Sequence, residues 1–234
     1  MHLDWLHRTR SLIGEDNLQA LKASSVAVVG LGGVGSFAAE AIARCGVGRM
    51  ILIDKDRVDI TNINRQLIAL QSTVGEYKVD VMKKRIADIN PEANIDTYAV
   101  AYTAGTADTF IFAGVDVIID AIDSIDDKVE LISRATRAGI PILSCMGAGN
   151  KLDPGAFEVA DLSMTSVCPL ARVMRKRLRD IGIEHLRVVY SREPATRSAL
   201  VGSISFVPPA AGLLLASEAV RMIFEKKNNG KAGP

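Results

Sequence analysis

The stretch Val26-Ala27-Val28-Val29-Gly30-Leu31-Gly32-Gly33-Val34-Gly35 decides the fold of this chain. Its four leading apolar residues predict a buried β-strand, and the glycine-rich turn after them joins the strand to a helix expected over residues 36–44. Glycine allows the tight turn and lets backbone N–H groups approach an anion, and the helix dipole adds partial positive charge at the same place. The stretch therefore predicts a nucleotide-binding loop, with glycines at Gly30, Gly32, Gly33 and Gly35.

A second apolar run, residues 50–53, ends at Asp54, about twenty residues after the loop. A Rossmann-type unit places at this spacing the carboxylate that accepts hydrogen bonds from ribose hydroxyls. We therefore expect an adenine nucleotide whose ribose binds Asp54. The loop does not distinguish NAD, FAD and ATP, and alone it favours a dehydrogenase. No Gly-x-x-x-x-Gly-Lys-Ser/Thr segment occurs in the sequence, which excludes a P-loop mechanism.

Two cations follow the loop at positions that suit phosphate binding. Arg65 lies in the polar run Asn62-Ile63-Asn64-Arg65-Gln66, and Lys78 begins a segment with apolar residues at helical spacing. A cation at a helix N-terminus is unfavourable for the helix itself, so Lys78 makes sense if an anion shares the site. Arginine offers phosphate a planar fork and lysine a compact charge. Together they favour a triphosphate, although each cation alone is typical of an ordinary surface residue.

A further buried parallel strand is predicted within residues 115–123, and it ends with two carboxylates. Ligands of open α/β sheets bind at this carboxyl edge. Mg²⁺ is a hard cation that is usually held by one or two carboxylates and by substrate phosphates. Asp123 is the better metal candidate, because Asp120 can instead hydrogen-bond a neighbouring loop. Asp126 or Asp127 is expected to cap the next helix.

Taken in order, the glycine loop, Asp54-x-Asp56, Asn62-x-x-Arg65-Gln66, Lys78 and Asp120-x-x-Asp123 resemble the ubiquitin-activating-enzyme-like superfamily. The resemblance covers residues 8–148 most strongly. Members of this superfamily adenylate a carboxylate with ATP and Mg²⁺. The resemblance implies that Asp54 holds the ribose, that Arg65 and Lys78 contact the phosphates and that Asp123 binds the metal. Beside the glycines, the implied nucleotide-binding residues are Asp54, Asp56, Asn62, Arg65, Gln66 and Lys78.

The superfamily resemblance also implies a homodimer. In such enzymes an arginine near the N-terminus reaches into the nucleotide site of the partner subunit. Arg8 is similar to that residue, and Arg10 is a close competitor. The implied catalytic residues are Arg8, acting in trans, together with Arg65, Lys78 and Asp123.

Within the superfamily, Arg8-Thr9, Gly75-x-x-Lys78 and Asp120-Ala121-Ile122-Asp123-Ser124 are most similar to the tRNA threonylcarbamoyladenosine dehydratases. These enzymes activate the threonyl carboxylate of a modified adenosine beside the anticodon and close a ring with release of AMP. The resemblance therefore implies an ATP-dependent, tRNA-modifying cyclising ligase. The alternative is an adenylyltransferase that activates the C-terminal carboxylate of a ubiquitin-like sulfur-carrier protein. A dinucleotide-dependent oxidoreductase shares only the glycine loop.

The three cysteines, Cys45, Cys145 and Cys168, form no Cys-x-x-Cys pair, so no structural zinc is expected. This argues against the zinc-containing branch of the sulfur-carrier enzymes. Cys168 precedes Pro169 in a polar segment, where an exposed thiol could accept an acyl group or sulfur, or could be a bystander. Cys45 and Cys145 are expected to be small buried apolar groups. Sulfur-relay proteins are a partner class that the sequence leaves open.

One concentrated basic surface is expected on a helix over residues 171–180. Four cations at i, i+3, i+4 and i+7 share one helix face, namely Arg172, Arg175, Lys176 and Arg179. Several phosphate contacts from this face would make tRNA binding steeply salt-dependent. A solvated helix face is an equally good interpretation, so the expectation of tRNA binding depends mainly on the resemblance.

With 234 residues, 48% of them hydrophobic, the chain can bury the core of one α/β domain. We expect a Rossmann-like, mostly parallel sheet with helices on both faces over residues 1–146, and an extension with mixed strands over 147–234. The net charge of +1 gives no general nucleic-acid signature. The cysteine usage and the lack of a signal-peptide pattern or a membrane span predict a cytoplasmic protein. In the extension, strands are expected at 157–160, 188–190 and 203–207, and a final core helix at 210–224.

Overall fold

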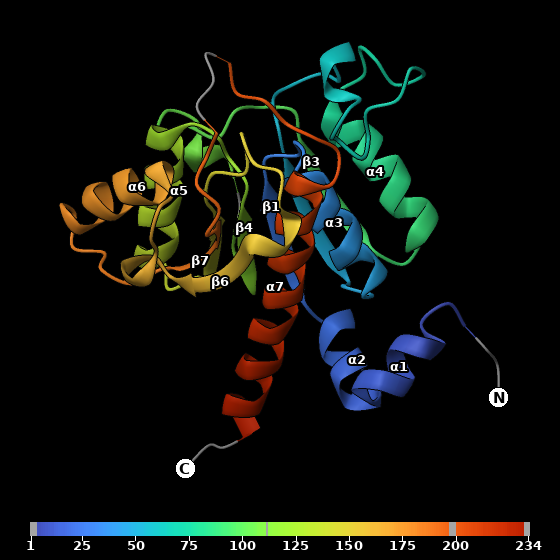
Figure 1. Cartoon of the computed structure of the whole chain (residues 1–234). Coiled ribbons are helices and arrows are strands. Elements are labelled where there is room, and N and C mark those ends of the chain that lie inside the picture. The colour runs from blue at the N-terminus through green and yellow to red at the C-terminus, as the bar shows by residue number, and fades with distance from the viewer. Residues whose placement is uncertain (1–3, 111, 197–199, 232–234) are drawn as a thin grey trace.

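Seven strands form one sheet within the residues that the computed structural model describes, which are 4–110, 112–196 and 200–231. The strand order is β3-β2-β1-β4-β5-β7-β6, and every neighbouring pair is parallel except the last, β7 with β6 (Figure 1). This confirms the expected mostly parallel sheet with a mixed extension. The strands are β1 (Ser25–Val29), β2 (Arg49–Ile53), β3 (Asn94–Tyr98), β4 (Val117–Asp120), β5 (Ile142–Cys145), β6 (Phe157–Asp161) and β7 (Arg187–Ser191).

Helices cover both faces of this sheet. The face that carries Val26 and Val28 packs against α3, α4 and α7, and the face that carries Ala27 and Val29 packs against α5 and α6. The alternation follows from the strand geometry, in which successive side chains point to opposite faces. The helices are α1 (His7–Ile13), α2 (Glu15–Lys22), α3 (Gly35–Arg44), α4 (Lys78–Ile89), α5 (Ile125–Arg137), α6 (Pro169–Arg179) and α7 (Val207–Lys231).

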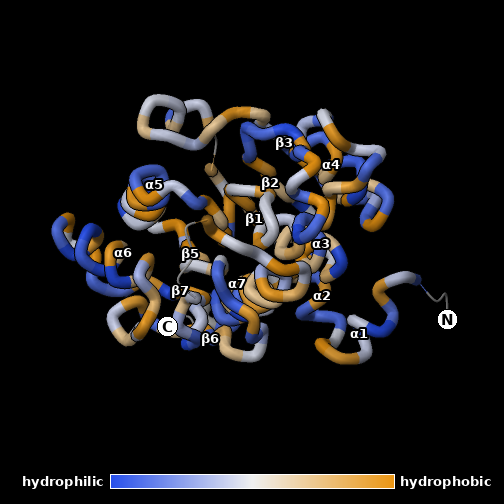
Figure 2. The backbone as a smooth tube through the Cα atoms, turned by 45° about the horizontal axis from the view of Figure 1, so that its top comes forward, coloured by the Kyte–Doolittle hydropathy of each residue, from blue (hydrophilic) through white to orange (hydrophobic). Residues whose placement is uncertain are grey.

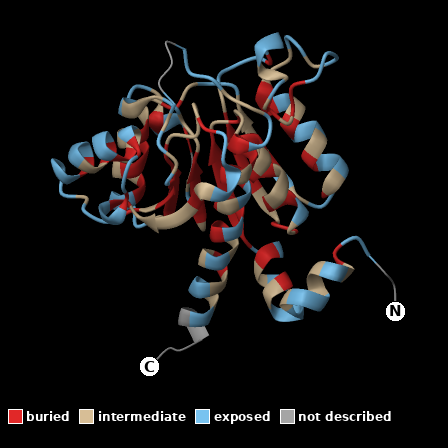
Figure 3. Cartoon of the chain, viewed as in Figure 1, coloured by how far each residue is buried: buried red, intermediate tan, exposed pale blue. Residues whose placement is uncertain are grey.

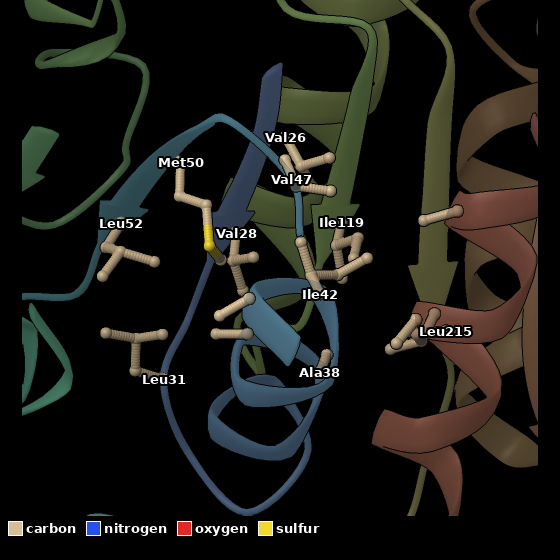
Figure 4. Close-up of a cluster of buried hydrophobic side chains, with 14 of the residues drawn as sticks. Val26, Val28, Leu31, Ala38, Ile42, Val47, Met50, Leu52, Ile119 and Leu215 are labelled. Carbon is tan, nitrogen blue, oxygen red and sulfur yellow. The ribbon is translucent and has the colours of Figure 1, made fainter. Parts of the chain in front are cut away.

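The centre of the sheet is buried from both sides. All five residues of β1 are buried, as expected for a central parallel strand (Figure 3). On one face, Val26 and Val28 lie near Ala38 and Ile42 of α3, with Leu215 of α7 closing the same cluster (Figure 4). This packing fixes the first strand and the first long helix, and hence the glycine loop between them.

The last helix is long and apolar. Val207–Asn228 has the length and hydropathy of a membrane span, but more than half of its most apolar window is buried inside the fold. Ala211, Leu215 and Ala219 of α7 lie in the same buried cluster as the sheet residues. The predicted core helix is therefore confirmed, and it is longer at both ends than residues 210–224.

Two local predictions were wrong. Residues 203–207 form no strand, because Val207 already begins α7. Pro208 and Pro209 suit the first turn of a helix, where no N–H donor is needed, and they could not serve a strand ladder. Asp126 and Asp127 do not cap α5 either, since both lie inside its first turn, where they favour the helix dipole, after the cap position Ser124.

Candidate nucleotide-binding site

The glycine loop is shaped by two close backbone approaches. Gly30 has a φ of +91°, and a Cβ there would lie 2.6 Å from the carbonyl oxygen of Ala121. A Cβ on Gly35 would lie 1.8 Å from the carbonyl oxygen of Gly30. Only glycine fits at either position. Among the described residues no side chain caps the N-terminus of α3, so its partial positive charge is available to an anion.

Asp54 joins the loop to the end of β2. Its carboxylate accepts a hydrogen bond from the backbone N–H of Leu31 at 2.6 Å and another from that of Asp56 at 2.8 Å. Burial raises the pKa of the Asp54 carboxyl, and the nearby Lys78 ammonium opposes this shift. The predicted ribose carboxylate is thus held rigidly beside the glycine loop, with lone pairs left to accept from a ligand.

Lys78 is the first residue of α4, as predicted, and its side chain is only 6% exposed. The ammonium lies 2.9 Å from a carboxylate oxygen of Asp56 and 4.0 Å from one of Asp54. The backbone N–H of Lys78 also donates to the carbonyl of Asp56 at 3.0 Å. Asp80 in the first turn offsets the unfavourable cation at this helix end. The structure therefore brings three predicted site residues together.

Arg65 follows the short 3₁₀ helix Ile60–Asn62 and lies beside the loop, since a Cβ on Gly33 would be 3.3 Å from its Cγ. Its guanidinium donates to the carbonyl of Thr61 at 3.0 Å and to the side chain of Asn64 at 2.9 Å. These bonds use one of its two terminal nitrogens, Nη1, and leave the rest of the fork available. Arg65 is therefore placed to meet a phosphate group near the loop.

The two amides of the same run have different surroundings. Asn62 accepts from the backbone N–H of Asp59 at 3.1 Å and so caps its own turn. Gln66 is 7% exposed, and its side-chain oxygen has no hydrogen-bond partner within the described ranges. An unsatisfied buried amide oxygen is costly, so a donor from a ligand or water would stabilise it.

Asp123 follows the end of β4 and is exposed. It makes no hydrogen bond or ion pair with any residue that the structure describes. Within 4–110, 112–196 and 200–231 no three His, Cys, Asp or Glu residues group as ligands for a metal ion. A lone carboxylate at the edge of a phosphate site still fits Mg²⁺, which takes most of its ligands from phosphates and water.

Arg8 lies far from the glycine loop of its own chain. Leu6, the residue before α1, lies beside Gly46, since a Cβ placed on Gly46 would be 2.9 Å from a Leu6 methyl group. Gly46 in turn follows the C-terminus of α3. The glycine loop is at the other end of α3, about 15 Å away for ten residues (Figure 1). Arg8 is exposed and unpaired among the described residues, whereas Arg10 is paired with Asp4 and Glu15, at 2.7 Å each.

Cys168 was expected to be exposed, and this was wrong. The residue is 3% exposed and packs among the apolar side chains of α6, with Ala171 and Met174. The residue before it, Val167, has a φ of 48° and is exposed. Cys145 is buried as predicted, and burial raises its pKa to about 12. Cys45 is half-buried, and burial likewise raises its pKa.

The basic face of α6 is only partly free. The guanidinium of Arg175 donates to the carbonyl of Leu162 at 3.1 Å and to the carbonyl and hydroxyl of Thr165 at 2.7 and 2.6 Å. It therefore holds the preceding loop. The other three predicted cations are exposed, and Figure 2 shows much of α6 as hydrophilic. They are Arg172, Lys176 and Arg179.

A cavity of about 500 Å³ lies away from this site. Its lining includes Tyr102, Phe110, Phe112 and Arg134, and Val115 places it near the amino end of β4. Ligands of open α/β sheets bind at the opposite, carboxyl edge, where the residues described above converge. We therefore expect the nucleotide at the carboxyl edge of the sheet and not in this cavity.

The family model described as the ThiF family matches residues 6–233. The chain belongs to the ThiF family. This ThiF-family chain is 46% identical over 233 residues to the tRNA threonylcarbamoyladenosine dehydratase of Bacillus subtilis, covering 91% of this chain and 92% of that protein. It also resembles the crystal structure of the Escherichia coli tRNA N6-threonylcarbamoyladenosine dehydratase in complex with ATP. That match has a TM-score of 0.90 and 36% identity, and covers 97% of this chain and 95% of the other.

Another relative is less similar. The sulfur carrier protein adenylyltransferase of Thermus thermophilus is 33% identical over 143 residues, which are 60% of this chain and 52% of that protein. The likeness to the B. subtilis dehydratase therefore covers a larger share of this chain than this shorter match does.

Proposed function

We propose that this chain is an ATP-dependent tRNA threonylcarbamoyladenosine dehydratase. The observation that carries the proposal is the near-full-length likeness to the B. subtilis dehydratase, at 46% identity over 91% of the chain. It is supported by the site, in which a glycine loop, a buried ribose carboxylate and two phosphate cations converge at one edge of the sheet.

In the proposed reaction, a threonyl carboxylate oxygen attacks the α-phosphorus of ATP and expels pyrophosphate. An atom of the neighbouring ureido group then attacks the activated carbonyl, closes a ring and releases AMP. The oxygen lost from the carboxylate leaves with AMP, so the nucleoside loses one water in total. Positioning and charge neutralisation provide most of the acceleration in phosphoryl chemistry. The glycine loop and Asp54 orient the nucleotide, while Arg65 and Lys78 neutralise its phosphates.

Mg²⁺ is the proposed metal, and Asp123 is its protein ligand. When bound, the ion would neutralise phosphate charge. The support for this role is the free carboxylate of Asp123 at the carboxyl end of β4, beside a turn that contacts Gly30. The other site residues bind and orient ATP directly. They are the four loop glycines, Asp54, Asp56, Asn62, Arg65, Gln66 and Lys78.

A homodimer with Arg8 acting in trans completes the proposed site. Arg8 lies at the amino edge of its own sheet and is unpaired among the described residues, so a role at a phosphate requires a second subunit. Arg10 is the weaker candidate, because two carboxylates of its own chain already hold it. A trans arginine adds roughly 10³–10⁵ in rate in other nucleotide enzymes.

The tRNA is proposed to lie along α6. Arg172, Lys176 and Arg179 are exposed and provide phosphate contacts, whereas Arg175 acts through the loop that it holds. A buried Cys168 fits a bystander better than an acyl carrier. We place the enzyme in the cytoplasm, where unpaired cysteines are stable, and leave sulfur-relay proteins as partners to be sought.

ATP–pyrophosphate exchange tests the proposal directly. Exchange should depend on tRNA that carries threonylcarbamoyladenosine and should be absent with the same tRNA lacking the modification. Arg65→Ala and Asp123→Ala should abolish it. Exchange driven instead by the C-terminus of a ubiquitin-like sulfur-carrier protein, with none on modified tRNA, would replace this function by the adenylyltransferase alternative.

A further inference from the structure

A charged network lies in the core beneath the turn that carries Asp123. It consists of Asp120 at the end of β4, Lys128 of α5 and Ser144 of β5, each 0% exposed. The ammonium of Lys128 lies 2.8 Å from Oδ2 of Asp120, and the hydroxyl of Ser144 donates to the same oxygen at 2.6 Å. The network reaches no solvent, so its members contact neither ATP nor tRNA directly.

The second oxygen of Asp120 controls the backbone after the strand. Oδ1 accepts a hydrogen bond from the backbone N–H of Ile122 at 3.1 Å, and the N–H of Ala121 donates to the carbonyl of Val29 at 2.8 Å. Ala121 in turn contacts the glycine loop, because its carbonyl oxygen lies 2.6 Å from a Cβ placed on Gly30. The turn is therefore held between the charged network below and the nucleotide loop beside it.

Folding alone does not explain this network. Replacing a buried ion pair by apolar residues of similar volume is often neutral or stabilising, because both charges lose their hydration. A buried polar network does, however, fix one geometry, since every member must keep its partner. Here the geometry that it fixes is that of the turn from Ala121 to Asp123.

We propose that Lys128, Asp120 and Ser144 are positioning residues that preset this turn for the metal and the nucleotide. Lys128 pairs with Asp120, whereas Asp123, three residues further on, has no cationic partner among the described residues. Asp120 then fixes the backbone that presents Asp123 and packs against Gly30. The metal-binding role of Asp123 in this inference rests on the proposed function. The effect of Asp120 on the backbone of the turn does not depend on any ligand.

Two double variants separate geometry from charge. D120L/K128M removes both charges and the acceptor for the Ile122 N–H, whereas D120N/K128M removes the charges but keeps an amide oxygen as acceptor. The first readout is the Mg²⁺ concentration at half-maximal ATP binding, measured by calorimetry. It should rise about tenfold in D120L/K128M, as when the residues that orient a metal ligand are changed at other sites, and stay within about twofold in D120N/K128M.

The second readout needs no ligand. Amide hydrogen exchange at Ile122 should accelerate in D120L/K128M and remain slow in D120N/K128M, at similar melting temperatures. Equal exchange in the two variants would overturn the proposal. R187M/E218L is the control, because it removes an ion pair of 2.9 Å between β7 and α7 whose residues do not belong to the site. An equal rise in the Mg²⁺ requirement in this control would also overturn the proposal.

Asp123→Ala distinguishes a failure of the metal assignment from a failure of the positioning role. An unchanged Mg²⁺ requirement in this variant would refute the metal assignment in the proposed function. A raised requirement in Asp123→Ala together with an unchanged one in D120L/K128M would refute the positioning role alone. If D120L/K128M does not fold, Ser144→Ala decides instead, because it removes one donor without stranding a charge. It should raise the requirement by about threefold, and no change would overturn the proposal.

Discussion

The ammonium of Lys78 lies 2.9 Å from the carboxylate of Asp56 and 4.0 Å from that of Asp54, although the lysine side chain is only 6% exposed. Two carboxylates around one amine leave an excess of negative charge before any nucleotide binds. An incoming triphosphate adds more, and like charges at these distances repel strongly when poorly hydrated. The site therefore needs further cations, and Arg65, Mg²⁺ and the partner's arginine are the proposed sources.

Replacing Lys78 should disable the site. Lys78→Met removes the buried cation that pairs with Asp54 and Asp56, so ATP–pyrophosphate exchange should fall by about 10²-fold or more. The matched control is Lys55→Met, because Lys55 is exposed and lies between the same two carboxylates in the sequence. Lys55→Met should keep near-normal exchange. Comparable exchange in both variants would show that the buried ammonium has no role in catalysis.

The glycines of the loop should separate into two kinds. Gly30→Ala combines a φ of +91° with a Cβ 2.6 Å from the Ala121 oxygen, so it should reduce the free energy of unfolding by about 1–3 kcal/mol. At Gly32 an added Cβ finds its nearest neighbour 3.9 Å away, on Gln66. Gly32→Ala should therefore fold normally and weaken ATP binding. Urea unfolding and calorimetry measure the two effects, and a Gly30→Ala protein as stable as the parent contradicts the packing argument.

Mixed dimers test the trans arginine. Arg8→Ala and Lys78→Met should each be inactive alone. After subunit exchange, half of the dimers pair an intact site of one chain with Arg8 from the other, and activity should recover to about a quarter of the parent level. The same mixture with Arg10→Ala in place of Arg8→Ala provides the comparison. Failure to recover any activity, with exchange shown by mass spectrometry, would place Arg8 outside the catalytic site.

Cys168 should be dispensable for chemistry. The thiol is buried against the apolar side of α6, so Cys168→Ala should cost about 1 kcal/mol of stability through lost packing and leave exchange and ring closure nearly intact. The corresponding Cys145→Ala variant controls for loss of a buried thiol nearby. A large loss of turnover confined to Cys168→Ala would instead indicate a covalent intermediate on this residue.

The parts of the fold that follow from local chemistry were accessible from the sequence. Residue spacing alone predicted three features: the glycine loop, the carboxylate of Asp54 and the helix that begins at Lys78. The α7 start was missed although Pro208 and Pro209 signalled it, because the apolar run before them also suited a strand. Helical spacing placed Arg175 with Arg172 and Arg179, but spacing cannot tell which cation a neighbouring loop will occupy.

The burial of polar side chains and of one thiol was the main feature that could not be predicted from the sequence. Nothing in the sequence marks Lys128 as the buried partner of Asp120, because the pair forms only when α5 packs on the sheet. Cys168 looked exposed for the same reason, because its neighbours Ser166, Val167 and Pro169 are exposed while the cysteine itself is buried. Tertiary packing decides both cases.

Mass spectrometry of tRNA nucleosides shows whether this enzyme dehydrates threonylcarbamoyladenosine. Modified tRNA is incubated with the enzyme, ATP and Mg²⁺, then digested, with Lys78→Met as the inactive control. We expect threonylcarbamoyladenosine to lose one water in the presence of the parent enzyme, with AMP and pyrophosphate formed in equal amounts. Unchanged threonylcarbamoyladenosine after complete incubation with active, ATP-binding enzyme would contradict this expectation.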